Sequence, residues 1–154
     1  MYNILISGYY GFNNIGDESV LRTVVDDLRT SFDDIDVTIL SRDPADTEEK
    51  HQIHAVPRMN VPAIIRAVRR CDLLISGGGS LLQDATSRLS ILYYLFIIWL
   101  ALLMRKKVFI YSQGIGPIRR RLSRRLTARC LRRVDGICVR DEASAELLRQ
   151  LQVP

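Results

Sequence analysis

An acidic side chain, a basic side chain and two glycine-rich turns are the parts of this sequence most able to do chemistry. Asp17 comes directly after Gly16, the turn Gly77–Gly79 leads into Ser80, and Arg140 follows a short apolar run. A carboxylate can act as a general acid or base, and successive N–H groups in a glycine turn can hold a phosphate or a carboxylate. The combination indicates a site for a substrate that carries hydroxyl groups or negative charge.

Three short apolar runs each end in a polar turn that contains glycine. The runs are residues 3–7, Leu73–Ser76 and Val108–Ser112. The turns that follow contain, in chain order, Gly8, Gly11 and Gly16, then Gly77, Gly78, Gly79 and Ser80, and then Gln113, Gly114 and Gly116. In an open α/β sheet, ligands bind outside the carboxyl ends of parallel strands. We therefore predict that these three strands are adjacent and parallel, and that their turns line one edge of the sheet.

The rest of the chain alternates between strand and helix patterns. Further strands are predicted at residues 36–40, 53–56 and 136–139. Helices are predicted at residues 17–30, 62–70, 89–104, 119–134 and 141–151, with a short one that begins at Asp43 and Pro44. Repeated β-α units predict a doubly wound, mostly parallel sheet of the Rossmann-like α/β class. The 154 residues fit one domain.

The most apolar segment is Leu89–Met104, in which only Ser90 is polar among sixteen residues. A bilayer core requires about 20 apolar residues, so this segment is short for a membrane span. Its place between two strand-and-turn units predicts a packed crossover helix, with membrane contact as the alternative.

The net charge of +5 arises from one segment. Arg119–Arg133 contains eight arginines and no acidic residue, while the rest of the chain carries 14 basic and 17 acidic residues. A nucleic-acid partner is therefore not favoured, since the chain is not basic throughout. Apolar residues recur at intervals of four from Ile118 to Cys130, which predicts a helix that packs on one side and fans its arginines outward. The outer side is either solvated or attracted to an anionic membrane or polymer.

Cysteine and histidine are too few to predict a disulfide framework or a metal site. The three cysteines lack a Cys-x-x-Cys spacing, and the two histidines, His51 and His54, are expected at the surface. Free cysteines suit a reducing cytoplasm, and the chain begins with a strand-like run rather than a signal peptide. We expect a cytoplasmic protein that binds no metal, with contact to the inner face of the membrane as an open alternative.

Two familiar nucleotide-binding motifs are absent from the first turn. Gly11 and Gly16 have the spacing of a P-loop, but Asp17 and Glu18 stand where that loop has Lys and Ser or Thr. Two carboxylates there would repel a triphosphate. Because Gly8, Gly11 and Gly16 also miss the spacing of the dinucleotide fingerprint, neither an NTPase nor a dehydrogenase is expected.

Each polar residue near the turns also has a structural explanation. Asp17 could cap a helix, since an acid in the first turn accepts backbone N–H bonds. Asn13 and Asn14 could serve the turn itself, because asparagine tolerates left-handed backbone conformations. Gln83 and Asp84 form a polar pair in apolar surroundings, where Asp84 could cap a helix. Position and residue type leave both interpretations open.

Four motifs occur in order over almost the whole chain. They are residues 7–18, read Ser-Gly-Tyr-Tyr-Gly-Phe-Asn-Asn-Ile-Gly-Asp-Glu, residues 76–84, read Ser-Gly-Gly-Gly-Ser-Leu-Leu-Gln-Asp, residues 112–117, read Ser-Gln-Gly-Ile-Gly-Pro, and residues 139–142, read Val-Arg-Asp-Glu. Together they resemble the polysaccharide pyruvyl transferases, especially the bacterial members that pyruvylate secondary cell-wall polymers. Family members resemble two-domain glycosyltransferases of the GT-B type, in which two Rossmann-like halves face each other across a cleft. The resemblance implies that residues 1–154 are the N-terminal half, and that a C-terminal donor-site domain lies outside this chain.

The resemblance also implies an activity, the transfer of an enolpyruvyl unit from phosphoenolpyruvate to two hydroxyls of a sugar, often an N-acetylmannosamine. A cyclic ketal forms and phosphate is lost. Asp17 is then the catalytic acid or base, Arg140 matches an arginine expected to grip phosphoenolpyruvate, and no cofactor is needed. The acceptor is a sugar polymer or a lipid-linked saccharide. The other residues predicted to bind the substrates are Gly8, Asn13, Asn14, Gly16, Gly77, Gly78, Gly79, Ser80, Gln83, Asp84, Gln113 and Gly114.

Histidine and lysine groups that the family supplies from its second half have no counterpart in this chain. The chain alone is therefore not expected to catalyse the transfer. Two other interpretations stay open: a binding module or truncated fragment without turnover, and half of a GT-B glycosyltransferase that uses a nucleotide sugar. The donor that binds would separate the two enzymes.

Overall fold

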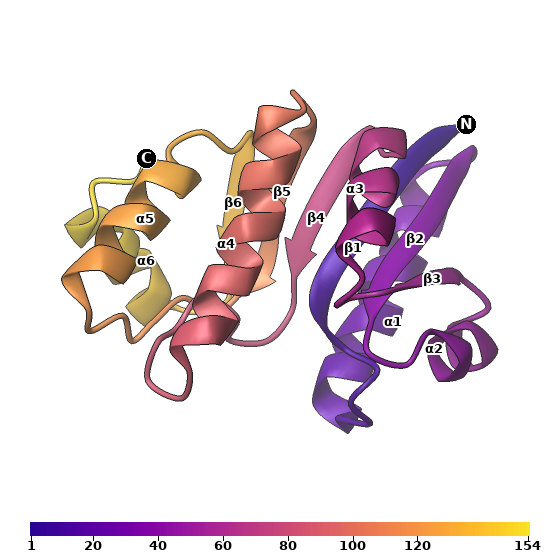
Figure 1. The fold of residues 1–154 in the computed structure, drawn as a ribbon, viewed down its shortest axis with the longest axis horizontal. Coiled ribbons are helices and arrows are strands. Elements are labelled where there is room, and N and C mark those ends of the chain that lie inside the picture. The colour runs from indigo at the N-terminus through magenta and orange to yellow at the C-terminus, as the bar shows by residue number, and fades with distance from the viewer.

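Six parallel strands form one sheet in the computed structural model, which describes residues 1–154 (Figure 1). The strands are β1 (Tyr2–Tyr10), β2 (Ile35–Ser41), β3 (His54–Pro57), β4 (Leu73–Gly77), β5 (Lys107–Gln113) and β6 (Gly136–Val139). Their order across the sheet is β3-β2-β1-β4-β5-β6, so the direction of winding reverses between β1 and β4. Ile6 of β1 pairs with Ile75 of β4, which pairs in turn with Phe109 of β5. The predicted adjacency of these three strands and the doubly wound Rossmann-like class are confirmed.

Helices cover both faces of this sheet. They are α1 (Ile15–Ser31), α2 (Pro44–His51), α3 (Val61–Arg70), α4 (Arg88–Leu103), α5 (Arg121–Leu131) and α6 (Glu142–Gln150). Figure 1 shows α3, α4 and α5 in a row on the near face of the sheet, while α1 lies behind it. The order of helices and strands along the chain is the predicted one.

Strand β1 is longer than predicted, because it continues past Ser7 to Tyr10. The pairing with β2 shifts between Ser7 and Tyr10, which allows Tyr10 to pair with Ser41. The Tyr10 side chain is fully buried, and its hydroxyl donates a hydrogen bond of 2.7 Å to the Gly77 carbonyl oxygen. Gly8 therefore lies within a strand rather than in a turn. A bulge of this kind breaks the alternation from which strands are predicted.

Polar side chains just before the helices fix where most of them begin. Asn14, Asn60 and Asp141 each accept a backbone N–H from the first turn of the helix that follows. Such caps satisfy donors that have no partner inside the helix. Helix α5 differs, because Arg120 at its start makes no side-chain cap.

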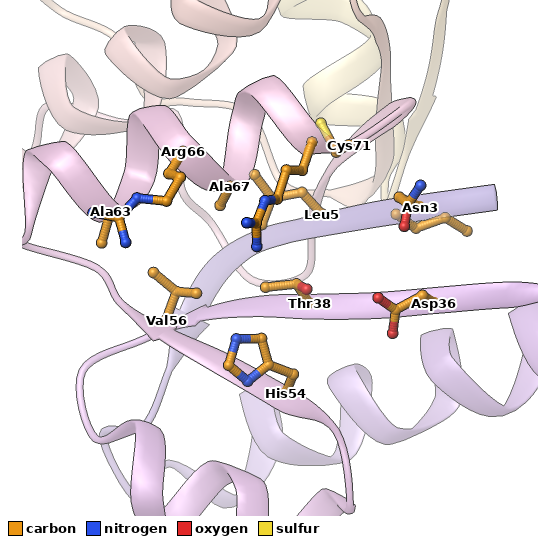
Figure 2. A pocket seen from close by; sticks show the side chains of 12 residues that line it. Asn3, Leu5, Asp36, Thr38, His54, Val56, Ala63, Arg66, Ala67 and Cys71 are labelled. Atoms are coloured by element: carbon orange, nitrogen blue, oxygen red, sulfur yellow. The ribbon is translucent and has the colours of Figure 1, made fainter. Parts of the chain in front are cut away.

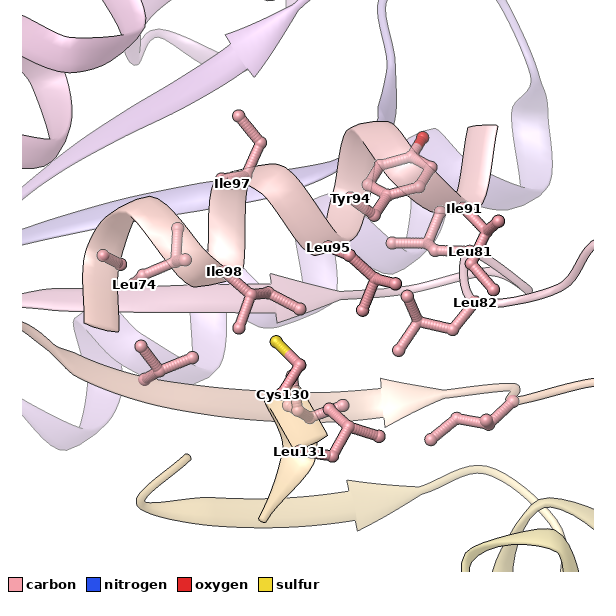
Figure 3. Close-up of a cluster of buried hydrophobic side chains, with 14 of the residues drawn as sticks. Leu74, Leu81, Leu82, Ile91, Tyr94, Leu95, Ile97, Ile98, Cys130 and Leu131 are labelled. Atoms are coloured by element: carbon pink, nitrogen blue, oxygen red, sulfur yellow. The ribbon is translucent and has the colours of Figure 1, made fainter. Parts of the chain in front are cut away.

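Helix α4 packs against the sheet with one side, as Figure 3 shows. Ile91, Ile97 and Ile98 are fully buried, and they belong to a core cluster that also includes Leu74 of β4 and Cys130 of α5. The prediction of a packed crossover helix is confirmed. None of the helices combines the length and the apolar character that crossing a membrane requires.

Truncation of a buried side chain of α4 should destabilise the fold. We expect Ile98→Ala to lower the free energy of unfolding by about 2–5 kcal/mol, because it removes a fully buried side chain and leaves a cavity. The matched control is Leu103→Ala on the same helix, whose side chain is 74% exposed and whose loss should cost less than about 0.5 kcal/mol. Urea unfolding of both variants measures the difference, and equal losses would contradict the assigned orientation of α4.

Candidate active site at the carboxyl edge of the sheet

The predicted glycine turns meet at the carboxyl edge of the sheet. The Gly114 N–H donates a hydrogen bond of 2.9 Å to the Gly79 carbonyl oxygen, which joins the turn after β5 to the turn after β4. The Gly78 N–H donates to the Tyr111 carbonyl oxygen at 3.2 Å. A β carbon at Gly8 would lie 2.7 Å from the Gly77 carbonyl oxygen, so β1 closes against the same turn. The predicted placement of the three turns along one edge is confirmed.

Asp17 and Arg140 lie on two sides of the turn after β4. A β carbon at Gly79, whose φ is +64°, would lie 2.8 Å from Asp17 Oδ1. On the other side, Arg140 Nη2 donates a hydrogen bond of 3.1 Å to Ser80 Oγ, and a β carbon at Gly114 would lie 2.7 Å from that nitrogen. Residues 123 positions apart in the chain therefore reach the same glycine turn.

The carboxylate of Asp17 is half-buried, and its surroundings favour the protonated form. Burial raises the pKa of Asp17 above its usual value, the neighbouring Glu18 adds to the shift, and Arg140 opposes it. Helix α1 begins at Ile15, and Asn14 caps it by accepting the Gly16 N–H at 3.0 Å. Asp17 is therefore not the capping side chain of this helix. An uncommitted carboxyl group with a raised pKa is suited to proton transfer.

Two cavities open beside these residues and share Ser80. The first has a volume of about 270 Å³, and the second has a volume of about 360 Å³. The first is lined by Tyr9, Asp17, Ser80, Leu81, Gln83, Thr86, Ser90 and Tyr94. The second is lined by Ser80, Gly114, Ile115, Gly116, Pro117, Arg140, Asp141, Ala143, Ser144 and Leu147. The first cavity thus has the carboxyl group of Asp17, and the second has Arg140 together with Asp141, whose Oδ2 lies 3.4 Å from Arg140 Nε.

Asp84 and Gln113 were predicted to bind substrate, and in the structure both side chains are buried and bonded to other parts of the chain. The Asp84 carboxylate accepts the backbone N–H groups of Arg119 and Arg120, at 2.8 and 3.0 Å, and so holds the two residues that lead into α5. Gln113 is fully buried and accepts a hydrogen bond from Ser76 Oγ at 3.2 Å. Neither side chain lines either cavity, so both support the edge.

The remaining predicted residues are turn formers at the surface or the cavity wall. Asn13 has a φ of 57° and accepts a hydrogen bond from Lys50 Nζ at 2.8 Å. Asn14 and Gly16 form the start of α1, as described above. Gln83 Oε1 accepts the Ala85 N–H at 2.9 Å and holds the loop that leads to α4. Gln83 lines the cavity that contains Asp17, and Asn13 lines a different cavity of about 390 Å³ beside Glu18 and His51.

Glu18 and His51 form a support that was not predicted. Glu18 Oε1 accepts the Gly11 N–H at 3.0 Å, and Glu18 Oε2 lies 2.8 Å from His51 Nε2 at the end of α2. The expectation that His51 lies at the surface was wrong, since only 9% of its side chain is exposed, while His54 is exposed as expected. The contact joins elements 33 residues apart, which no local pattern reveals.

Arg58 is a second unpredicted residue at this edge. Its guanidinium is buried, carries one nitrogen without a hydrogen-bond partner, and lies 5.1 Å from the Phe12 ring and 4.4 Å from the Tyr93 ring. Arg58 Nη2 also donates to the Tyr94 hydroxyl at 3.4 Å, and that hydroxyl donates to the Gly8 carbonyl oxygen at 3.4 Å. The aromatic residues of the first motif were the available signal, because cations pack on such rings.

A separate cavity of about 210 Å³ lies between helix α3 and strands β1, β2 and β3 (Figure 2). Its lining includes Asp36, His54 and Arg66, and it contains none of the predicted site residues. Nowhere in the chain do three or more His, Cys, Asp or Glu side chains gather in a group that could hold a metal ion.

The parallel sheet, its strand order and the turns at its carboxyl edge define a Rossmann-like α/β protein. Saccharopine dehydrogenase from Saccharomyces cerevisiae shares this fold, with a TM-score of 0.50 and 19% identity over 90% of this chain and 26% of that chain. An α-glucosyltransferase, solved in complex with UDP and DNA, shares it with a TM-score of 0.53 and 17% identity over 89% of this chain and 37% of that chain. At such identities the two structures show the fold alone.

The family model of the polysaccharide pyruvyl transferases matches residues 14–154, and the chain belongs to this family of transferases. One relative is the amylovoran biosynthesis protein AmsJ from Erwinia amylovora, which is 23% identical over 188 aligned positions. That alignment covers 96% of this chain and 44% of AmsJ, so the chain spans less than half the length of the curated relative it matches. The resemblance that the four motifs predicted is confirmed.

Loss of the Asp84 carboxylate should loosen the segment that leads into α5. We expect Asp84→Ala to lower the free energy of unfolding by about 1–3 kcal/mol at pH 7, because two backbone N–H groups lose their acceptor. Burial of Asp84 works against its charged form, but the hydrogen bonds from Arg119 and Arg120 outweigh it and hold the pKa below the usual value.

The same variant should show a defined pH dependence. Because the pKa of Asp84 is lower in the folded state, its contribution is fully present above the unfolded-state pKa of about 3.9 and is lost as pH falls through the lower folded value. Urea unfolding at pH 7 and pH 3 should therefore show a large difference between the two proteins at pH 7 and a smaller one at pH 3. A difference that grows toward pH 3 would rule out the assigned contact.

Proposed function

We propose that this chain is the acceptor-side half of a pyruvyl transferase that acts on a saccharide of a cell-wall or extracellular polysaccharide precursor. The donor is phosphoenolpyruvate, and the reaction needs no further cofactor. The observation that carries the proposal is the placement of Asp17 and Arg140 on two sides of one glycine turn, in a chain of the pyruvyl transferase family. An acid or base and an anion-binding cation are the groups that this chemistry requires.

The reaction has three events at the donor. The methylene carbon of phosphoenolpyruvate takes up a proton and becomes a methyl group, and two sugar hydroxyl oxygens form bonds to the carbon beside it. The bond from that carbon to the phosphate oxygen breaks, so phosphate leaves with the electron pair. Of the two protons released by the hydroxyls, one balances the proton on the methyl group, and the other leaves with phosphate or solvent. The raised pKa of Asp17 suits it to exchange one of these protons.

The glycine turn and Arg140 supply the positive side of the proposed site. Arg140 is exposed beside the larger cavity, whose lining also includes Ser80, Gly114 and the Asp141 carboxylate that lies 3.4 Å from Arg140 Nε. Phosphoenolpyruvate carries about three negative charges, and one arginine is a weak match for it. We therefore propose that a second, C-terminal domain of the GT-B arrangement provides the other cations, in keeping with the greater length of AmsJ.

Asp17→Asn should impair catalysis without unfolding the protein. The amide keeps the size of the side chain but cannot exchange a proton, so in the complete enzyme we expect kcat to fall at least about tenfold with little change in Tm. Asp26→Asn on the exposed side of α1 is the matched control and should leave kcat unchanged. The result that would contradict the role is an unchanged kcat together with a clear drop in Tm for Asp17→Asn.

The direction of the pH profile separates the two roles of Asp17. If Asp17 is the acid, kcat should fall as pH rises through its raised pKa, and if it is the base, kcat should rise over the same range. This change in kcat should occur above pH 3.9, which is the usual pKa of an aspartate side chain. It should be absent in the Asp17→Asn variant.

The residues described here should not transfer pyruvate by themselves. We expect the 154-residue chain to bind phosphoenolpyruvate with a Kd of about 1 mM or weaker, and to release no acceptor-dependent phosphate until the C-terminal half is added. In the complete enzyme, Arg140→Ala should raise KM for phosphoenolpyruvate. The matched control is Arg149→Ala, at an exposed position on α6, which should leave this KM unchanged. Rapid phosphate release by the chain alone would overturn the two-half proposal, and binding of a nucleotide sugar in place of phosphoenolpyruvate would favour a glycosyltransferase.

A further inference from the structure

Positive charge is concentrated on one face of the molecule. Residues 58–134, which include helices α3, α4 and α5, carry sixteen of the 22 basic residues and two of the 17 acidic ones. Both of these acids are already engaged, because Asp72 accepts hydrogen bonds from Asn3 and Asp84 accepts those at the start of α5. The three helices lie in a row on the same face of the sheet (Figure 1). Their outer surface therefore has an excess of cations that no acidic partner within these elements offsets.

An apolar stripe runs along α4 in the middle of this basic face. Leu89 and Leu103 are 78% and 74% exposed, and Leu92 and Phe96 are 40% and 42% exposed. Intervals of three, four and seven residues place all four on one side of a helix. Helical spacing places the buried residues Ile91, Ile97 and Ile98 on the opposite side, so the four exposed side chains form the outward surface of α4. We call Leu89, Leu92, Phe96 and Leu103 together the α4 stripe.

Exposed arginines flank the α4 stripe on both sides. Arg69 is exposed on α3, where Arg66 and Arg70 turn toward the cavity beside β1, β2 and β3, and Arg121, Arg125 and Arg129 are exposed on α5. At the border with α5, the Arg133 guanidinium lies 5.1 Å from the ring of Trp99. An apolar stripe between rows of cations is the pattern of a surface that lies in the interface of an anionic bilayer, with apolar side chains in the acyl region and arginines on the phosphates.

We propose that the α3–α4–α5 face docks on the surface of an anionic lipid bilayer, with the α4 stripe inserted below the headgroups. A second copy of the chain is a poor occupant, because self-association through this face would bring two rows of unpaired arginines together. A nucleic acid would bind the arginines but would leave the α4 stripe exposed to water. The bilayer is the partner that satisfies both the charge and the apolar surface.

The docked orientation also concerns the candidate active site. Ser90, in the first turn of α4, lines the cavity that contains Asp17, and Leu89 beside it is the most exposed residue of the stripe. Insertion of Leu89 would place that cavity close to the headgroups, where a lipid-linked saccharide is presented. This last step rests on the proposed function, whereas binding to the bilayer does not.

Vesicle binding tests the proposal through a probe that the chain already contains. Trp99 is the single tryptophan, and it is half-buried at the edge of the α4 stripe. The 154-residue chain is mixed with vesicles of phosphatidylcholine alone or with 30% phosphatidylglycerol, and binding is followed by sedimentation and by Trp99 fluorescence. We expect binding to the anionic vesicles only, weakened by salt, with a shift of Trp99 emission to shorter wavelength.

Paired variants separate insertion from adsorption. Phe96→Ser and the double variant Arg125→Glu/Arg129→Glu should each weaken binding at least about tenfold. The matched controls on α1 and its end, Phe32→Ser and Arg22→Glu/Arg29→Glu, should bind like the unaltered chain. All the side chains altered in these four variants are exposed in the structure. Circular dichroism checks that each variant is folded.

Three outcomes of the vesicle and solution measurements would overturn the proposal. They are no sedimentation with anionic vesicles, binding that Phe96→Ser leaves unchanged, and a dimer in solution that Phe96→Ser dissociates. Binding of a DNA duplex in preference to anionic vesicles would equally count against it. Loss of pyruvyl transfer plays no part in this test, so the bilayer proposal and the proposed function can fail separately.

Discussion

The close approach of three turns at the carboxyl edge of the sheet is the constraint on which the candidate site depends. A β carbon at Gly8 of β1 would lie 2.7 Å from the Gly77 carbonyl oxygen, and one at Gly114 would lie 2.7 Å from Arg140 Nη2 and displace that guanidinium. Contacts that short do not occur in folded proteins, so these positions require glycine or a displaced neighbour. The absence of side chains lets a carboxylate from α1 and a guanidinium beyond β6 reach the same turn.

Several buried polar contacts hold the turns in this arrangement. The Tyr10 hydroxyl binds the turn after β4, Glu18 binds the Gly11 N–H, and Asp84 binds the start of α5. Each contact satisfies a backbone group that would otherwise be unpaired in a half-buried position, where the cost is about 1–3 kcal/mol. Three charged groups face the two cavities, and Asp141 is committed to Ser144 at the start of α6, which is why Asp17 and Arg140 are the residues proposed for chemistry.

The fold could be predicted from local patterns, but part of the site could not. The alternation of apolar runs, glycine turns and helical spacings predicted the strand and helix order, because each pattern lies within one segment. The bulge that extends β1 to Tyr10, the Glu18–His51 contact and the bond from the Arg119 N–H to Asp84, 35 residues away, all depend on tertiary contacts. The sequence left open whether Asp84 caps a helix or binds substrate, and in the structure its carboxylate holds the segment before α5. The outward α4 stripe escaped prediction because the whole segment is apolar, so sequence did not distinguish its buried side from its exposed side.

The most direct test of the site is a map of where phosphoenolpyruvate touches the chain. A titration of the ¹⁵N-labelled protein, followed by amide chemical shifts at millimolar ligand, reports contact at each backbone N–H. The account predicts that the largest shifts occur at Gly78, Gly79, Ser80, Gly114 and Arg140, and that shifts around His54 and Arg66 are small. Shifts centred on the α3 cavity, with the glycine turns unaffected, would contradict the placement of the donor at the carboxyl edge.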